Sequence, residues 1–280
     1  MSGIFAALVW AMMPVVILNL ARIPPLEILS FALVIGFFSS IIIFYLTNFT
    51  LSLSSFDLKH TVLGTIAISG TACLYISAFK YSPPVHVEII MYVWPIIVIL
   101  TNIFLGRDHL TFKKILVIIL CFCALLSIHL ENLFSINMRG FYYFGYTLTF
   151  LAAISWAFYN IFTKNCDNPS QLMGFYAGIG APFILGLHFI FEISVFPTLQ
   201  EFLYLSVIGV LSKSLAYQAW DFAVKNSSPI VMTNIAYFIP ITSVIMLVMF
   251  GYSELTTHIL ISCFLLFSAT ALILPSKARS

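Results

Sequence analysis

The chain has 280 residues, of which 61% are hydrophobic and 8% are charged, and its mean hydropathy is +1.08. A soluble domain carries about 25% charged residues, so the composition excludes a soluble globular protein and makes lipid the solvent for most of the outer surface. The net charge of +2 is too small to indicate a nucleic acid partner.

Ten apolar runs follow one another, separated by polar residues or by Pro and Gly, and each predicts a membrane-spanning helix. They lie at 3–20, 27–48, 60–79, 85–105, 113–130, 139–163, 171–193, 200–223, 229–250 and 256–275. The first run begins at Gly3 without a basic segment or a cleavage site, so we expect a retained span rather than a signal peptide. The predicted fold is an all-α integral membrane protein with ten transmembrane helices and short loops.

Basic residues are distributed unevenly between the predicted loops. If the N-terminus is cytoplasmic, eight of the 12 Lys and Arg residues fall in inside segments, three fall outside, and Lys213 lies within a span. The positive-inside rule therefore predicts that both termini face the cytoplasm.

An internal repeat divides the chain into 1–134 and 135–280. At a shift of 145 residues, M-Y-V-W-P-I (91–96) overlays A-Y-F-I-P-I (236–241), and at a shift of 146, A-A-L-V-W-A (6–11) overlays A-A-I-S-W-A (152–157). Each unit holds five predicted spans, an odd number, so the second copy must enter the membrane from the opposite side. Two such inverted five-helix repeats are typical of secondary transporters, which bind substrate between the halves.

These elements resemble the EamA-type branch of the drug/metabolite transporter superfamily. The resemblance is carried by the 5+5 repeat, by the W-A element in the first span of each half, and by the Pro-x10-Pro and G-x3-L-T elements. The stretch YSPPVHVEIIMYVWPIIVIL (81–100) is similar to the corresponding helix of the bacterial aromatic amino acid exporters in that group. The resemblance implies a multi-pass protein of the bacterial cytoplasmic membrane. It also implies a central cavity lined by the first, third, fourth, sixth, eighth and ninth helices.

Lys213 lies near the middle of the predicted eighth span, about 15 Å from either interface at 1.5 Å per residue. A charge at this depth costs on the order of 2.5–3.5 kcal/mol, so it must face water, an anion or a carboxylate. Its counterpart in the first half is Ile68, which means that the fold itself does not require a lysine. We expect Lys213 to bind the carboxylate or phosphate of a substrate; a structural ion pair between helices is the alternative.

Aromatic residues are the second group of candidates for substrate binding. Trp10 and Trp156 occupy matching positions halfway along the first span of each half, which favours cavity lining over an interfacial anchor. Aromatic side chains at neighbouring positions of the same predicted cavity would stack on a flat or apolar substrate; aromatic packing alone is the alternative. These further candidates are Tyr75, Tyr92, Tyr217, Tyr237, Trp94 and Trp220.

Three further residues in the spans are candidates for coupling and movement. Glu88 lies one turn into the fourth span, either as a proton-coupling carboxylate or as a partner of helix-end amides near the water surface. Pro95 and Pro240 fall inside spans at matching positions and predict kinks, either hinges or static bends. Asp221, beside Trp220, is expected at the interface rather than at the site.

The remaining chemistry-bearing residues exclude several function classes. The five Cys and six His residues show no ligand spacing, so we predict no metal and no cofactor, and the absence of a G-x4-G-K-[ST] loop argues against ATP-driven transport. We predict a monomeric secondary transporter, not an enzyme, that moves a small organic metabolite through the lipid bilayer by alternating access. An amino acid, with the aromatic ones as candidates, is the favoured substrate. The alternatives are a carrier of a nucleotide-linked or S-adenosyl compound and a membrane-embedded lipid-modifying enzyme.

Overall fold

The computed structural model describes residues 1–47, 57–133, 141–164, 166 and 168–273. Within these residues every regular element is helical, which confirms the predicted all-α class. Five helical segments of the described chain are long and apolar enough to cross a membrane, judged by length and composition. They lie at 25–46, 58–78, 84–104, 172–191 and 199–226.

All ten predicted runs are helical, and their bounds agree with the apolar runs to within a few residues. The first half contains α1 (Ser2–Leu18), α2 (Pro25–Leu46), α3 (Leu58–Ala78), α4 (Pro84–Met91), α5 (Trp94–Phe104) and α6 (Phe112–Leu133). The second half contains α7 (Phe141–Thr163), α8 (Leu172–Phe191), α9 (Leu199–Val207), η2 (Ile208–Ala216), α10 (Tyr217–Asn226), α11 (Pro229–Met249) and α12 (Thr257–Ile273).

The two predicted prolines have unequal effects on their helices. The fourth run breaks in two, because α4 ends at Met91 and α5 begins at Trp94, with Pro95 in its first turn. Proline lacks an N–H group and its ring clashes with the carbonyl four residues earlier, so a helix tends to stop just before it. Pro240, by contrast, lies inside α11, which continues past it as one helix.

The eighth run is continuous but changes its winding. Between α9 and α10 lies a π-helix, η2, whose nine residues include Lys213. Such wider turns are rare and occur frequently at functional sites. The corresponding segment of the first half, α3, is an ordinary α-helix.

Helices α2 and η2 approach each other closely at two glycines. A Cβ atom on Gly209 would lie 2.7 Å from the Ile35 Cβ and 3.0 Å from the Ala32 carbonyl oxygen, and one on Gly36 would lie 2.8 Å from the Lys213 Cβ. Small residues allow such close backbone contact between apolar helices. The packing of α2 therefore fixes the position of the backbone that carries Lys213.

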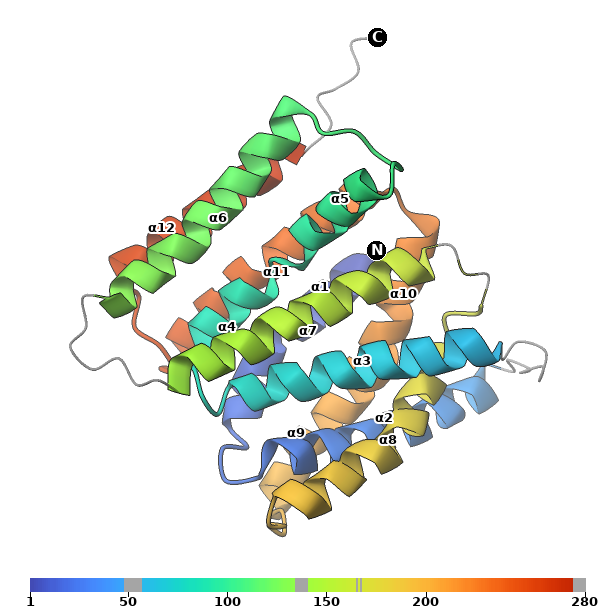
Figure 1. Ribbon diagram of the computed structural model, residues 1–280. Coiled ribbons are helices and arrows are strands. Elements are labelled where there is room, and N and C mark those ends of the chain that lie inside the picture. Colours follow the sequence, from blue (N-terminus) through green and yellow to red (C-terminus); the bar gives the residue numbers. More distant parts are fainter. Residues whose placement is uncertain (48–56, 134–140, 165, 167, 274–280) are drawn as a thin grey trace.

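The helices pack in layers around two apolar cores. Helices α6 and α12 pair at one end of the molecule, and α2 pairs with α8 at the other (Figure 1). Between them α3 packs on α7, and α1 packs on η2, α10 and α11. The larger core contains Trp94, Trp156 and Trp220, and the smaller one lies between α4, α5, α6, α11 and α12.

Substitution of Gly209 by alanine tests the close approach of α2 and η2. Because the added methyl group meets Ile35 and the backbone of Ala32, we expect Gly209→Ala to lower the free energy of unfolding by about 1–3 kcal/mol. Thermal unfolding of the purified protein in detergent measures this. The matched control is Gly186→Ala in α8, where a Cβ would meet nothing within 4 Å and the helix should become no less stable. Equal unfolding temperatures for the two variants would contradict the packing argument.

Candidate functional site

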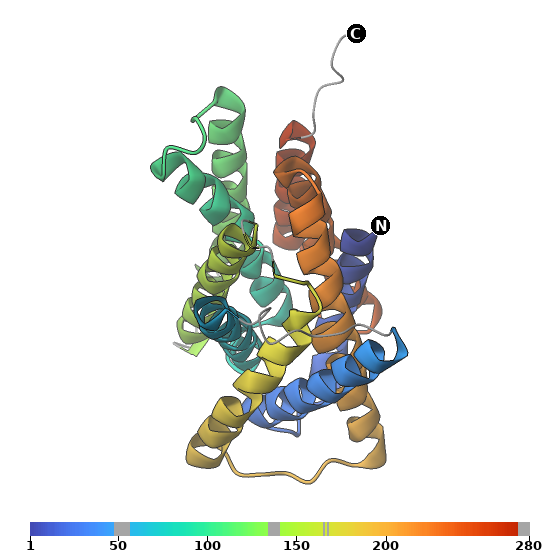
Figure 2. The ribbon, with the colours of Figure 1, turned by 90° about the vertical axis from the view of Figure 1, so that its right-hand side faces the viewer.

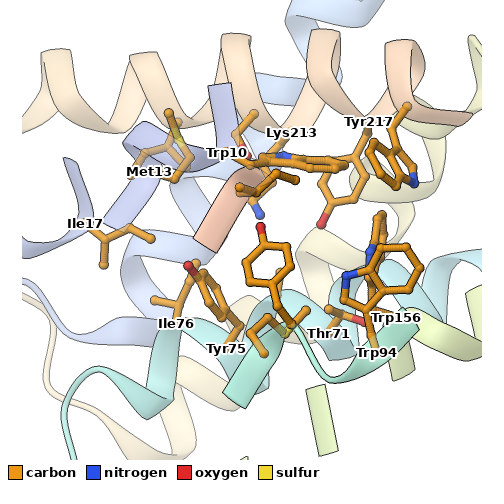
Figure 3. A pocket seen from close by; sticks show the side chains of 17 residues that line it. Trp10, Met13, Ile17, Thr71, Tyr75, Ile76, Trp94, Trp156, Lys213 and Tyr217 are labelled. Carbon is orange, nitrogen blue, oxygen red and sulfur yellow. The ribbon is translucent and has the colours of Figure 1, made fainter. Parts of the chain in front are cut away.

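A buried cavity lies where six helical segments meet (Figure 3). Its walls come from α1, α3, α4–α5, α7, η2–α10 and α11, which are the six spans implied by the family resemblance. The cavity has a volume of about 80 Å³, which gives room for several water molecules.

Most of the predicted substrate-binding residues lie in the wall of this cavity. They are Trp10, Tyr75, Tyr92, Trp156, Lys213, Tyr217 and Trp220. Glu88 does not line the cavity but is hydrogen-bonded to the hydroxyl of Tyr75, which does. The side chain of Tyr237 lies outside the part of the molecule that the structure describes.

The side chain of Lys213 points away from η2 and places its amine in the cavity (Figure 3). The side chain is 6% exposed, and its Nζ lies 5.2 Å from the centroid of the Tyr217 ring. This distance fits a cation–π contact, which strengthens when water is excluded. None of the ion pairs among the described residues includes Lys213. Within the described chain, the cation is therefore free to bind an anionic group that enters the cavity.

Four aromatic side chains beside Lys213 form one wall. Trp10 is the centre of this aromatic cluster, with ring centroids 5.4 Å from Trp156, 5.5 Å from Tyr217 and 5.3 Å from Trp220. These separations are in the favourable range for aromatic pairs. The indole N–H of Trp220 donates to the Asn160 side-chain oxygen at 2.9 Å, which fixes the ring. The cluster presents rigid apolar faces next to one positive charge.

Several wall residues were missing from the sequence-based prediction. They are chiefly Met13, Ile17, Thr71, Met91 and Ser212, whereas Trp94, which also lines the wall, is one of the predicted aromatic candidates. Thr71 precedes Tyr75 by four residues and Met13 follows Trp10 by three, so helical spacing places each on the face of a predicted residue. Periodicity around the aromatic candidates would have found these two residues.

The cavity is closed beyond the aromatic cluster by a second polar group, which contains Asp221. This residue is fully buried within the protein. Its carboxylate forms an ion pair with Lys225 at 2.7 Å and accepts hydrogen bonds from Tyr159, at 2.6 Å, and from Thr163. Lys225 lies four residues later on the same helix face, and this partner makes burial of the charge possible. We refer to this closure between α7 and α10 as the Lys225 end.

At the opposite end, the α1–α2 turn is bonded to residues 192–201, whose extended part runs along the lower edge of Figure 2. Arg22 pairs with Glu201, with N–O distances of 2.5 and 3.0 Å, and this hydrogen bonding raises the pKa of the Arg22 guanidinium. The carboxylate of Glu192 accepts backbone N–H bonds from Leu26 and Glu27 at the start of α2, where the helix dipole favours a negative charge. We refer to this region as the Arg22 end.

The cavity approaches the surface at the Arg22 end. Ile17 and Ile76 line both the cavity and a second hollow of about 250 Å³. Arg22 and Lys80, both exposed, border this second hollow. Two isoleucine side chains therefore separate the buried site from a basic vestibule.

Comparison with known proteins gives relatives over the full length of the chain. The EamA-like transporter family matches residues 1–130 and again residues 143–274. The chain is 22% identical over 270 residues to the aromatic amino acid exporter YddG of Ancylobacter novellus, covering 96% of this chain and 94% of that protein. A solved structure described only as "Crystal structure of protein" superposes with a TM-score of 0.81 at 20% identity, covering 100% of this chain and 98% of that one. The structural match shows the shared fold.

Neutralising Asp221 tests the closure at the Lys225 end. Asp221→Asn leaves the Lys225 amine without its buried partner, and we expect a loss of roughly 3–5 kcal/mol in the free energy of unfolding, since breaking a buried pair strands a charge. Adding Lys225→Met should restore part of this loss. The control is Asp108→Asn, which breaks the surface pair with Lys114 and should cost about 0–1 kcal/mol. If denaturation in detergent gives the same loss in the free energy of unfolding for Asp221→Asn as for Asp108→Asn, the closure is refuted.

Proposed function

Because the chain belongs to the EamA-like transporter family, we propose that it is a secondary transporter of an aromatic amino acid in the bacterial cytoplasmic membrane. It is a membrane protein and a transporter of a small molecule, not an enzyme. The observation that carries the proposed substrate is the amine of Lys213, unpaired among the described residues, beside the aromatic cluster in one buried cavity.

Each part of an aromatic amino acid has a counterpart in this cavity. The substrate carboxylate binds the Lys213 amine, since a hydrogen bond between charged groups is strong and short. The substrate ring lies against Trp10 and Trp156, which offer edges and faces for aromatic contact. The hydroxyl groups of Tyr75 and Tyr92, which also line the wall, can accept hydrogen bonds from the substrate ammonium.

Residues 1–134 and 135–280 act in this proposal as two inverted five-helix halves around the cavity. The double match to the family supports the duplication. The packing supports it too, because contacts recur when each helix is exchanged for its counterpart: α1 packs on α11 as α7 packs on α4 and α5. The helices at the two ends, α2 with α8 and α6 with α12, pair with their own counterparts. Both halves contribute walls, so rocking of one against the other exposes the site alternately.

The closures at the two ends would then be the gates. With both termini cytoplasmic, the Lys225 end faces the cytoplasm and the Arg22 end faces outward. Opening toward the cytoplasm parts α7 from α10, whereas opening outward moves Ile17 and Ile76 apart. The break before Pro95 and the proline-interrupted hydrogen bonding at Pro240 are the proposed hinges.

The charge of the cavity wall favours an aromatic amino acid over the alternative substrates. Lys213 is the one charged residue among the described residues of its wall, whereas a nucleotide-linked compound would bring several negative charges that need more cations. A single carboxylate matches a single amine. No group of three or more His, Cys, Asp or Glu residues that could hold a metal is present in the described chain, so nothing there supports a metal-dependent lipid-modifying enzyme.

Transport of radiolabelled tryptophan into proteoliposomes tests this function. Loss of the charge in Lys213→Met should lower the initial rate by about tenfold or more, because a hydrogen bond to a charged group contributes about 1.5–3 kcal/mol. Lys213→Arg should retain part of the activity, since it keeps the charge. The control is Lys59→Met, which removes an exposed amine at the start of α3. Transport by Lys213→Met at the wild-type rate would exclude the proposed role.

A further inference from the structure

Glu88 is a buried acid that the binding of an amino acid leaves unused. It lies in α4, is 1% exposed, and is absent from the described cavity wall. None of the ion pairs among the described residues includes it. A carboxylate buried without a cation is unfavourable by several kcal/mol, so a neutral, protonated form has to be available to it.

Glu88 is nevertheless connected to the cavity by a hydrogen bond to one side chain of its wall. The hydroxyl of Tyr75, on α3, donates a hydrogen bond to the Glu88 Oε1 atom. Tyr75 itself lines the cavity, as Figure 3 shows. A proton can therefore pass between Glu88 and cavity water through this hydroxyl, which gives up one proton, receives another and ends unchanged.

Ser243 on α11 lies between Glu88 and α1. Its hydroxyl donates to the Ala11 carbonyl oxygen of α1 at 2.9 Å, and the Glu88 carboxyl group is its other polar neighbour. A serine hydroxyl has a single proton, which can be directed at Ala11 or at a Glu88 carboxylate but not at both.

Loss of the proton from Glu88 would change a contact between the two halves. Ser243 would have to turn its hydroxyl proton from Ala11 to the carboxylate, and the bond between α11 and α1 would be lost. The Glu88 carbonyl also accepts the Tyr92 N–H bond, at 3.3 Å, that ends α4 at the helix break. The carboxyl group thus lies one turn from the proposed hinge and on a contact that must change during alternating access.

The other titratable groups near Glu88 have partners elsewhere or belong to the cavity. His86, on the same helix, is bonded through Nδ1 to the Tyr146 hydroxyl of α7 at 2.7 Å. Tyr92 lines the cavity, and on α6 the Cys121 thiol is buried in the core that contains Val85 and Ile89 of α4. Among the described residues, no second acid and no cation faces Glu88 from α3, α6, α7 or α11.

We propose that Glu88 is a proton-binding site that couples substrate movement to a proton gradient, with Tyr75 as its link to the cavity and Ser243 as its link to the opposite half. This inference rests on the proposed transport function. In one conformation the carboxyl group is protonated and Ser243 holds α1; in the other the proton has left through Tyr75. Each transport cycle therefore moves a proton together with, or in exchange for, the amino acid.

Proteoliposomes test the coupling with tryptophan as the probe. An imposed pH gradient should drive accumulation by the wild-type protein. Glu88→Gln, which mimics a permanently protonated carboxyl group, should lose this accumulation while tryptophan–tryptophan exchange still takes place, because exchange needs no net proton movement. Glu254→Gln, at an exposed loop acid, should respond like the wild type. A gradient response of Glu88→Gln equal to that of the wild type, or a wild-type protein that transports tryptophan but ignores the gradient, would overturn the proposal.

Infrared difference spectroscopy tests the same site without a substrate. A pH titration of the purified protein should show the carbonyl stretch of a buried carboxylic acid that disappears in Glu88→Gln and shifts in Tyr75→Phe. An identical titrating band in Glu88→Gln would overturn the assignment. If wild-type protein carries no tryptophan in any mode, the proposed function fails, and the infrared titration still decides whether Glu88 takes up the proton.

Discussion

A positive charge held inside a membrane protein without a buried counter-charge is the constraint on which this structure depends. Lys213 is buried, and none of the ion pairs among the described residues includes it. Such a charge is tolerated only where water or a ligand reaches it. The cavity, the aromatic wall and the close packing behind η2 all serve this requirement. In the proposed function, the carboxylate of the substrate supplies the missing negative charge.

The asymmetry between the halves follows from the same constraint. The family model matches the chain twice, yet the lysine, the π-helix and the glycine contact with α2 occur on η2, whereas α3 is an ordinary α-helix that carries Ile68. The buried acid Glu88 and the broken helix belong to the first half. In the two proposals, the substrate therefore binds an ionisable group of the second half, and the proton binds one of the first half that reaches the cavity through Tyr75.

The sequence predicted the helices well because lipid solvation demands long apolar runs, and the internal repeat pointed to the residues that line the cavity. The π-helix was not predicted; it lies where Gly36 and Gly209 let α2 and η2 approach each other, a tertiary contact that the apolar runs do not reveal. The burial of Asp221 could not be predicted either, because it depends on the tertiary contact with Tyr159 and on the ion pair with Lys225. Pro95 and Pro240 occupy matching positions in the sequence, yet only the helix before Pro95 is broken.

The most direct measurement compares binding of tryptophan and tryptophan amide, which differ in the carboxylate, to wild-type protein and to Lys213→Met. If the lysine holds the carboxylate, the wild type should bind tryptophan at least about tenfold more tightly than the amide, and this preference should fall to about one in the variant. The two ligands keep the ring contacts constant, so the ratio isolates the charged pair. An equal preference in both proteins would contradict the account.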